Sequence, residues 1–212
     1  MEFSVKVDLD LVSSFSSDEL AAYIALLTHL YSVSHRTHKF PTSVDMLCFY
    51  ATGTDKYPQS FHSAVNKGLD ELQFNGYIHG KQPYVLTIYI PGYDAERLLN
   101  PKRFVTLYLW EIQKIICSKY IEKFAVLKYY IFLLSTFNNG VGRMTLDILQ
   151  EVSGFARMSV ISYNNILQKL KIIVIVQNKE SKSNYVRNIY ARYEDAEIIG
   201  GTFDEDGELI DI

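Results

Sequence analysis

Residues 145–170 read TLDILQEVSGFARMSVISYNNILQKL, and this stretch decides how the second half of the chain folds. Residues 145–149 predict a short helix, and Ser153-Gly154 is a pair of small residues typical of the turn that would follow it. Beyond this turn, apolar side chains recur at the three- and four-residue spacing of one helical face. They are Val160, Tyr163, Leu167 and Leu170. We therefore expect a short helix, a turn and a longer helix that buries one face.

The sequence on both sides of this stretch completes a larger unit. Before it, residues 104–109 are rich in β-forming side chains and lead into helical material that ends near Ser135. After it, residues 172–176 predict a strand, residues 177–184 a polar turn and residues 185–193 a returning strand. A helix, a short helix, a turn, a longer helix and a hairpin in this order are typical of a winged helix-turn-helix domain.

The first half of the chain has the same order of features. Ser16-Ser17-Asp18-Glu19 has the spacing of a capping box and predicts the start of a long helix. Pro41-Thr42 is expected to open a second, shorter helix, and Pro58 a third. Asn75-Gly76 would close the third helix, and residues 84–90 form a β-rich return.

The two halves also correspond in register. Residues 44–47 (VDML) lie 102 residues before residues 146–149 (LDIL), and Leu69 lies 98 residues before Leu167. A recurrence of order and spacing at an interval near 100 residues indicates two copies of one structural unit.

The expected fold class is α+β: mainly α-helical with small β-hairpin wings, built as two tandem winged helix-turn-helix domains. We place the first domain at residues 1–90, a linker at residues 91–101, the second domain at residues 102–193 and an acidic C-terminal tail at residues 194–212. The linker is marked by Pro91-Gly92 and Asn100-Pro101.

Charge is distributed unevenly along the chain, although the net charge is only −3. Residues 91–193 hold 15 Lys and Arg against 7 Asp and Glu, whereas residues 1–90 hold 6 against 9. Residues 194–212 hold 8 acidic residues and no Lys or Arg. This asymmetry predicts a middle segment that faces a polyanion and an acidic tail that is solvated or competes for the same surface.

The outward side of the longer helix in the second domain predicts a DNA-reading surface, because the second helix of this motif enters the major groove. Arginine can pair with guanine, asparagine with adenine and serine with either base, while lysine attracts phosphate. The hairpin that follows is expected to contact the DNA backbone or the minor groove. The candidates are Arg157, Ser159, Ser162, Asn165 and Lys169 on the helix and Lys179, Lys182, Asn184 and Arg187 on the hairpin. The alternative is an ordinary solvated helix face.

The first domain offers a second set of polar side chains that could bond to bases. They are Gln59, Ser60, His62, Ser63, Asn66 and Lys67, all in its third helix. The net charge of −3 over residues 1–90 gives this domain little attraction for phosphate. It therefore either reads bases beside a more basic partner or forms a protein interface. A possible homodimer would use the aromatic-rich residues 104–136.

A resemblance supports this interpretation. Residues 145–154 and 159–170 resemble the winged helix-turn-helix of bacterial regulators. Residues 188–195 (NIYARYED) are similar to the end of the wing strand in tandem winged-helix proteins of Gram-positive plasmids, phages and conjugative elements. The resemblance implies a role in starting or regulating replication, or in repressing transcription. The sequence differs from the usual pattern at Lys171-Ile172-Ile173, where a glycine would close the recognition helix.

Motifs of catalysis are absent from the sequence. It contains no P-loop, no Gly-x-Gly-x-x-Gly, no Gly-x-Ser-x-Gly and no set of Cys and His at metal-ligand spacing. We therefore expect no enzyme activity, cofactor, metal or small-molecule substrate. His35-x-x-His38 is interpreted as a polar loop, and Asp45 and Asp147 as helix-start residues.

The sequence also bears on location. Cys48 and Cys117 lie within apolar stretches and are interpreted as buried small hydrophobes. Residues 1–15 lack the features of a secretory signal. Charged residues interrupt the most apolar region, residues 104–137, so that no segment is suited to span a bilayer. A cytoplasmic location is the expectation.

Two classes of function remain. The first is a sequence-specific double-stranded DNA-binding protein of a mobile element, acting in transcription regulation or as a replication initiator at repeated origin sites. The second is a winged-helix module for protein contacts that does not read DNA. Salt-dependent binding to duplex DNA distinguishes the two classes.

Overall fold

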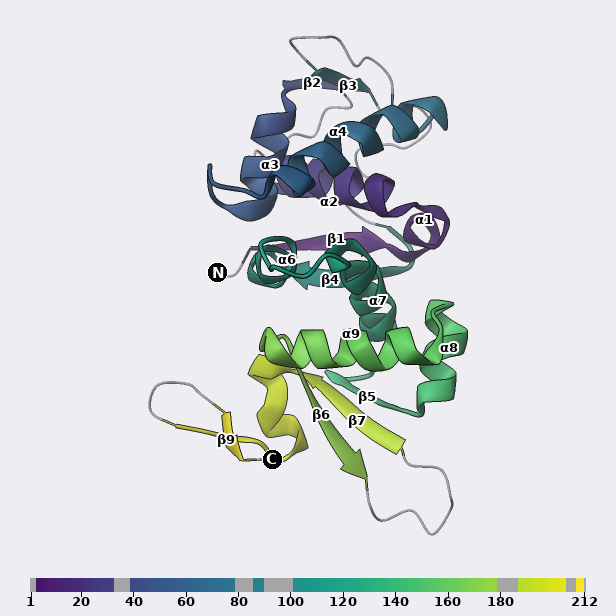
Figure 1. Ribbon diagram of the computed structural model, residues 1–212, viewed down its shortest axis with the longest axis vertical. Helices are drawn as coiled ribbons and strands as arrows, with labels where there is room; N and C mark the ends of the chain where they lie inside the picture. Colours follow the sequence, from purple (N-terminus) through teal and green to yellow (C-terminus); the bar gives the residue numbers. More distant parts are fainter. Residues whose placement is uncertain are drawn as a thin grey trace. The chain divides into compact units, whose positions relative to one another are not determined.

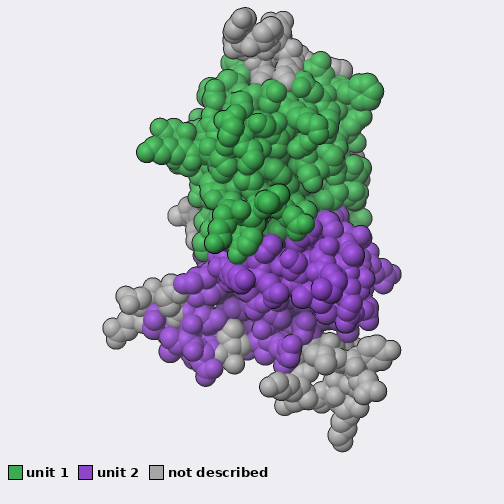
Figure 2. Space-filling model, in the orientation of Figure 1, with its two compact units in different colours: residues 1–128 green, residues 129–212 purple. Residues whose placement is uncertain are grey.

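The chain forms two compact units, residues 1–128 (unit 1) and residues 129–212 (unit 2), coloured separately in Figure 2. The computed structural model describes residues 3–32, 39–78, 86–89, 101–178, 187–204 and 209–211. Both units combine helices with small antiparallel sheets, which confirms the expected α+β class.

Unit 1 begins with a strand and two helices, which are followed by a second strand and two further helices (Figure 1). Its elements are β1 (Ser4–Asp8), α1 (Leu9–Ser14), α2 (Ser17–Ser32), β2 (Lys39–Thr42), α3 (Val44–Thr52), α4 (Gln59–Phe74), β3 (Leu86–Tyr89), β4 (Phe104–Tyr108) and α6 (Leu109–Ile116). The next helix, α7 (Lys123–Ser135), contains the boundary between the units.

The long helix α2 is the centre of unit 1, because all its residues from Glu19 to Leu30 are buried. The capping box expected at its start is confirmed. The Ser16 N–H donates to Glu19 Oε2 (2.7 Å), and the Glu19 N–H donates to Ser16 Oγ (3.1 Å). Gly68 lets α4 approach closely, since a Cβ there would lie 1.9 Å from the carbonyl oxygen of Asp18.

Strands β1 and β4 form an antiparallel pair that joins residues about 100 positions apart, with Lys6 opposite Thr106. Two tyrosines of α2 cover the outer edge of β1, since the N–H groups of Lys6 and Asp8 donate to the hydroxyls of Tyr31 (3.4 Å) and Tyr23 (3.2 Å). This pairing places β4 in unit 1. The observed boundary therefore differs from the linker expected at residues 91–101.

Unit 2 continues α7 with a strand, two helices and a β-hairpin. Its further elements are β5 (Val141–Met144), α8 (Leu146–Ser153), α9 (Arg157–Lys169), β6 (Ile173–Asn178), β7 (Arg187–Arg192), the 3₁₀-helix η1 (Tyr193–Ile199), β8 (Thr202–Phe203) and β9 (Leu209–Asp211). Strands β5, β7 and β6 make an antiparallel sheet in that order, with β7 in the centre.

Helix α3 of unit 1 and helix α8 of unit 2 begin and end in the same way. Thr145 caps α8 by accepting the Ile148 N–H (3.3 Å), and Ser43 caps α3 in the same way. Each of these helices ends at a glycine in the left-handed region, Gly154 with φ 71° and Gly53 with φ 67°.

One expected helix start in unit 1 is wrong. Pro41-Thr42 does not open a helix, because these residues belong to β2 and pair with β3. The helix begins two residues later, at Val44, where Ser43 supplies the cap.

The following helices, α4 and α9, both end in a Schellman motif. In α9 the N–H groups of Lys171 and Ile172 donate to the carbonyls of Gln168 (2.9 Å) and Leu167 (3.0 Å). Gly76 holds the left-handed position after α4, but Lys171, with φ 52°, holds it after α9. The missing glycine therefore does not move the helix end, but it places a lysine in a conformation that L-residues disfavour.

Replacing Lys171 should show this backbone strain directly. We expect Lys171→Gly to be about 1 kcal/mol more stable than Lys171→Ala, because both changes remove the same side chain but only glycine adopts the left-handed region freely. Urea denaturation of the two variants measures the difference. Equal stability, or a more stable alanine variant, would contradict the account.

The acidic residues 194–212 are not a solvated tail where the structure describes them. Strand β7 leads into η1, and Ala196 of η1 forms a buried apolar cluster with Val174 of β6 and Ala191 of β7. Tyr193 and Phe203 pack against this cluster and contact each other edge to face, and the Tyr193 hydroxyl accepts the Leu209 N–H (3.0 Å). The acidic segment is therefore part of the fold of unit 2.

Removal of the Phe203 ring should destabilise unit 2. We expect Phe203→Ala to lower the free energy of unfolding by about 1–3 kcal/mol, because a partly buried aromatic side chain is lost from a packed cluster. Ile210→Ala in the neighbouring strand β9 is the control, because Ile210 is 66% exposed and should contribute little. If both variants unfold at the same urea concentration, the segment does not pack as described.

Candidate nucleic-acid interface

Helix α9 separates its side chains into a buried and an outward face. Of the expected buried positions, Val160, Tyr163 and Leu167 are confirmed, whereas Leu170 is only partly buried. The candidate residues Arg157, Ser162, Asn165 and Lys169 are exposed, and Ser159 is half-buried. The structure therefore brings the five helix candidates of unit 2 together on α9, as the helical periodicity predicted.

The orientation of α9 depends on Tyr129 of α7, which is fully buried. Its hydroxyl donates to Oδ1 of Asn164 on α9 (2.7 Å). Its ring also contacts Tyr163 (5.7 Å between centroids) and Phe155 (6.3 Å), the residue two positions before α9. A directional bond and two ring contacts therefore hold α9 at one rotation, with Asn164 inward and Asn165 outward.

A second buried tyrosine, Tyr190 of β7, extends this polar core. Its hydroxyl accepts the side-chain amide of Asn188 (3.1 Å). Burial raises the pKa of both Tyr129 and Tyr190, so that each remains a protonated hydroxyl at neutral pH. The sequence analysis did not identify Asn164 or its partner Tyr129.

Loss of the Tyr129 hydroxyl should cost stability. We expect Tyr129→Phe to lower the free energy of unfolding by about 1–3 kcal/mol, because it removes the hydroxyl that donates to the buried Asn164 carbonyl. Adding Asn164→Leu should restore part of that loss, since both polar groups are then gone. Urea denaturation of the single and double variants tests this coupling, and strictly additive losses would show that the two side chains do not interact.

Arg157 lies at the first position of α9. Its Nη1 is 2.5 Å from Oδ1 of Asp147, which stands in the first turn of α8. Both side chains are exposed, 54% for Arg157 and 65% for Asp147. The guanidinium is therefore accessible and held on one side by a carboxylate.

The hairpin candidates fall mostly outside the described residues. Lys179, Lys182 and Asn184 lie there, and only the backbone of Arg187 is placed, opposite Asn178 at the end of β7. Their contribution to a DNA-binding surface stays a prediction.

The unit boundary also divides the basic segment recognised in the sequence. Of its 15 Lys and Arg, 7 precede Tyr129 and belong to unit 1. Residues 129–193 hold the remaining 8, against 3 Asp and Glu. The basic excess around α9 is therefore smaller than expected, and the acidic residues 194–212 belong to the same unit.

The unit 1 candidates lie on α4, where Lys67 and His62 both contact carboxylates. Gln59, Ser60, Ser63, Asn66 and Lys67 are exposed, and His62 is partly buried. Lys67 forms ion pairs with Asp18 and with Glu71 (3.3 Å). His62 Nε2 is 3.5 Å from Oδ1 of Asp45 and its ring stacks on Tyr57. The Tyr57 hydroxyl donates to Asp45, which raises the pKa of Tyr57 to about 12.

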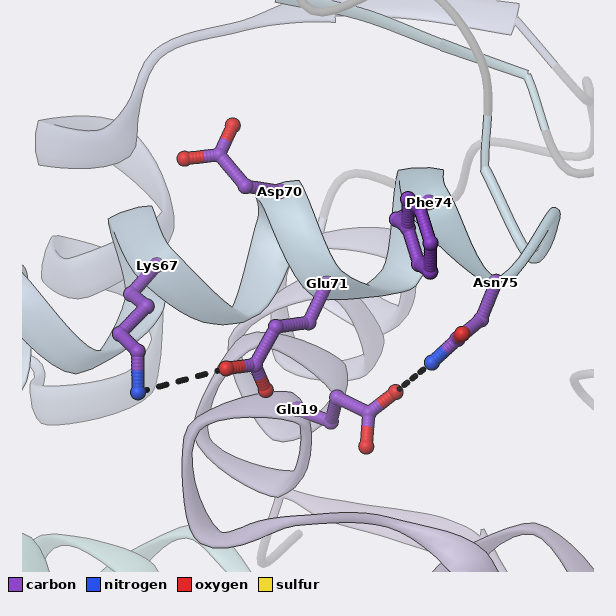
Figure 3. A pocket seen from close by; sticks show the side chains of 6 residues that line it. All are labelled: Glu19, Lys67, Asp70, Glu71, Phe74 and Asn75. Carbon is purple, nitrogen blue, oxygen red and sulfur yellow. Dashed lines mark hydrogen bonds and ion pairs between the residues drawn. The ribbon is translucent and has the colours of Figure 1, made fainter.

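An open depression of about 450 Å³ lies beside the C-terminal half of α4 (Figure 3). Its lining residues are Glu19, Lys67, Asp70, Glu71, Phe74 and Asn75. Lys67 points toward Glu71, and the Asn75 amide donates to Glu19 Oε1 (2.7 Å). A lining that holds three carboxylates and one lysine disfavours phosphate, so that the α4 surface suits DNA less well than that of α9.

Metal ligands, thiols and apolar helices are three further features that could mark a site. The described residues contain no group of three or more His, Cys, Asp or Glu that could hold a metal ion. Cys48 is buried as expected, but Cys117 is exposed, which corrects its assignment as a buried residue. His35 and His38 lie outside the described residues. Among the described helices, none has the length and apolar character needed to span a bilayer.

Comparison with known proteins adds no family assignment. No protein-family model matches the chain, and no curated protein matches it. The functional argument therefore rests on the geometry of the two units.

Proposed function

We propose that the chain is a sequence-specific double-stranded DNA-binding protein in which unit 2 is a winged helix-turn-helix domain and α9 is its recognition helix. The observation that carries this proposal is the outward face of α9. Apart from Met158, which is 75% exposed, its exposed side chains are polar, and Tyr129 holds it in place. It follows α8 across a glycine turn and precedes the β6–β7 hairpin. Helix, strand, helix, turn, helix and hairpin is the order that such a domain requires.

The residues of α9 suit distinct contacts in this proposal. Arg157, at the N-terminal end, would pair with a guanine edge, and Asn165 with adenine. Ser159 and Ser162 would bond to either base, and Lys169, at the C-terminal end, would meet phosphate. The residues between β6 and β7, with Lys179, Lys182, Asn184 and Arg187, would form the wing.

Unit 1 is proposed as a second winged helix, since its elements α2, β2, α3 and α4 and the β2–β3 pair follow the same order. Unit 1 holds 13 Lys and Arg against 13 Asp and Glu, whereas residues 129–193 of unit 2 hold 8 against 3, so that unit 1 attracts DNA less than this part of unit 2 does. We assign to it either base contacts from α4, with residues 129–193 supplying the attraction for phosphate, or a dimer contact.

A regulator of transcription and a replication initiator of a mobile element would both use this architecture. Selection of bound fragments from the parent replicon separates them: sites in one promoter indicate a regulator, and repeated sites at an origin indicate an initiator.

A second candidate function is a protein-interaction module that does not read DNA. Exposed apolar side chains favour it, because Met46 and Phe49 on α3 and Ile148 and Val152 on α8 are each at least 40% exposed. Binding to duplex DNA decides between the two functions.

The direct test replaces one residue at each end of α9. We expect Arg157→Ala to weaken binding to a duplex selected by the protein by about 1–3 kcal/mol and to change binding to random duplex little, because it removes a base contact. Lys169→Ala should weaken binding to both duplexes alike, because it removes a phosphate contact. It should also reduce the salt slope, which is the slope of log affinity against log salt concentration, by about one. Fluorescence anisotropy over a salt series measures both quantities.

Binding by the wild-type protein is the control for this test. If it binds no duplex at low salt, the DNA-binding proposal fails and the result favours the protein-interaction function. If it binds but neither variant differs from it, α9 is not the reading surface.

A further inference from the structure

The ion pair between Asp147 and Arg157 calls for an explanation other than stability. Both side chains are more than half exposed, and exposed ion pairs contribute little to folding. The pair places Oδ1 of Asp147 2.5 Å from Nη1 of Arg157, in the first turn of α9. The guanidinium therefore enters any contact already partly neutralised and already oriented.

Unit 1 has a carboxylate in the matching position. Asp45 lies 102 residues before Asp147, in the first turn of α3. It accepts the Tyr57 hydroxyl just before α4 and lies 3.5 Å from His62 in that helix. In both units, a carboxylate at the start of one helix contacts side chains at the start of the next. Only in unit 2 is the partner a permanent cation.

We propose that Asp147 is a specificity-determining residue of the α9 surface, which controls how Arg157 contacts DNA. An arginine has five N–H donors, and the contact at Nη1 leaves others free for the two acceptors of a guanine edge. The carboxylate also reduces the attraction of Arg157 for phosphate, which any sequence supplies. Asp147 thereby lowers affinity for random DNA more than affinity for the preferred site.

This inference rests on the proposed DNA-binding function, and the salt dependence of binding makes it measurable. A cation that meets phosphate releases a counterion and steepens the salt slope by about 0.9 per contact, whereas a cation already neutralised by a carboxylate adds less. Freeing Arg157 from Asp147 should therefore raise both the affinity for random duplex and the salt slope.

Two simpler roles of Asp147 have to be separated from this one. A negative charge anywhere near DNA weakens binding, and a carboxylate in the first turn of α8 stabilises that helix. Glu151 provides the matched control, because it lies on α8 one turn after Asp147 and is also exposed. Glu151→Gln changes the charge by the same amount without freeing Arg157.

The experiment compares Asp147→Asn, Glu151→Gln and the double variant Asp147→Asn/Arg157→Ala in the full chain. The probes are a duplex selected by the wild-type protein and a random-sequence duplex of equal length. We expect Asp147→Asn to tighten random-duplex binding about three- to tenfold and to raise its salt slope by about 0.9. The ratio of selected to random affinity should fall, whereas Glu151→Gln should leave this ratio unchanged. In the double variant, random-duplex affinity should return to about the wild-type level.

Three outcomes would overturn the inference. If Asp147→Asn and Glu151→Gln give the same affinities and salt slopes, Asp147 acts only as a general negative charge. If the effect of Asp147→Asn persists without Arg157, the carboxylate does not act through the guanidinium. If the wild-type protein binds no duplex, the proposed function itself fails. Circular dichroism and urea denaturation of each variant separate all three from a loss of folding.

Discussion

The hydrogen bond from the Tyr129 hydroxyl to Asn164 is the constraint on which the rest of unit 2 depends. Apolar packing alone drives α9 against the sheet but tolerates small rotations, because contacts between apolar side chains are not directional. A buried amide must find its partner, since the cost of an unpaired polar group in the core is large. Asn164 therefore fixes which side chains of α9 face outward.

The outward face of α9 that is fixed in this way carries few uncompensated cations. Ser162 and Asn165 are neutral and short, and Arg157 at the start of α9 is paired with Asp147. The folded acidic segment after β7 adds carboxylates to the same unit. A surface with few uncompensated cations gains little from phosphate attraction, which supports an account in which directional contacts, rather than net charge, determine what α9 binds.

The sequence predicted the features that arise from local physics. The spacing of Val160, Tyr163 and Leu167 is sufficient to locate α9, because a helix must turn one face inward every 3.6 residues. Gly154 and the Ser16 capping box act within a few residues of their own position, and they were recognised for that reason.

What the sequence did not predict depends on contacts between distant residues. The pairing of Lys6 with Thr106 moves β4 into unit 1, and no local pattern in residues 101–108 signals it. The acidic segment was expected to be solvated because its charges dominate its composition, whereas its packing depends on Tyr193 and Phe203. The Tyr129–Asn164 hydrogen bond joins residues 35 positions apart, and no local sequence pattern predicts it either.

The central claim, that α9 is the reading surface, is tested most directly by mapping amide chemical shifts during titration with a duplex that the protein has selected. The account predicts that the largest changes fall on residues 157–169 of α9 and on the segment between β6 and β7. Changes confined to α3 and α8, where the exposed apolar residues Met46, Phe49, Ile148 and Val152 lie, or no change along α9 at saturating DNA, would contradict it.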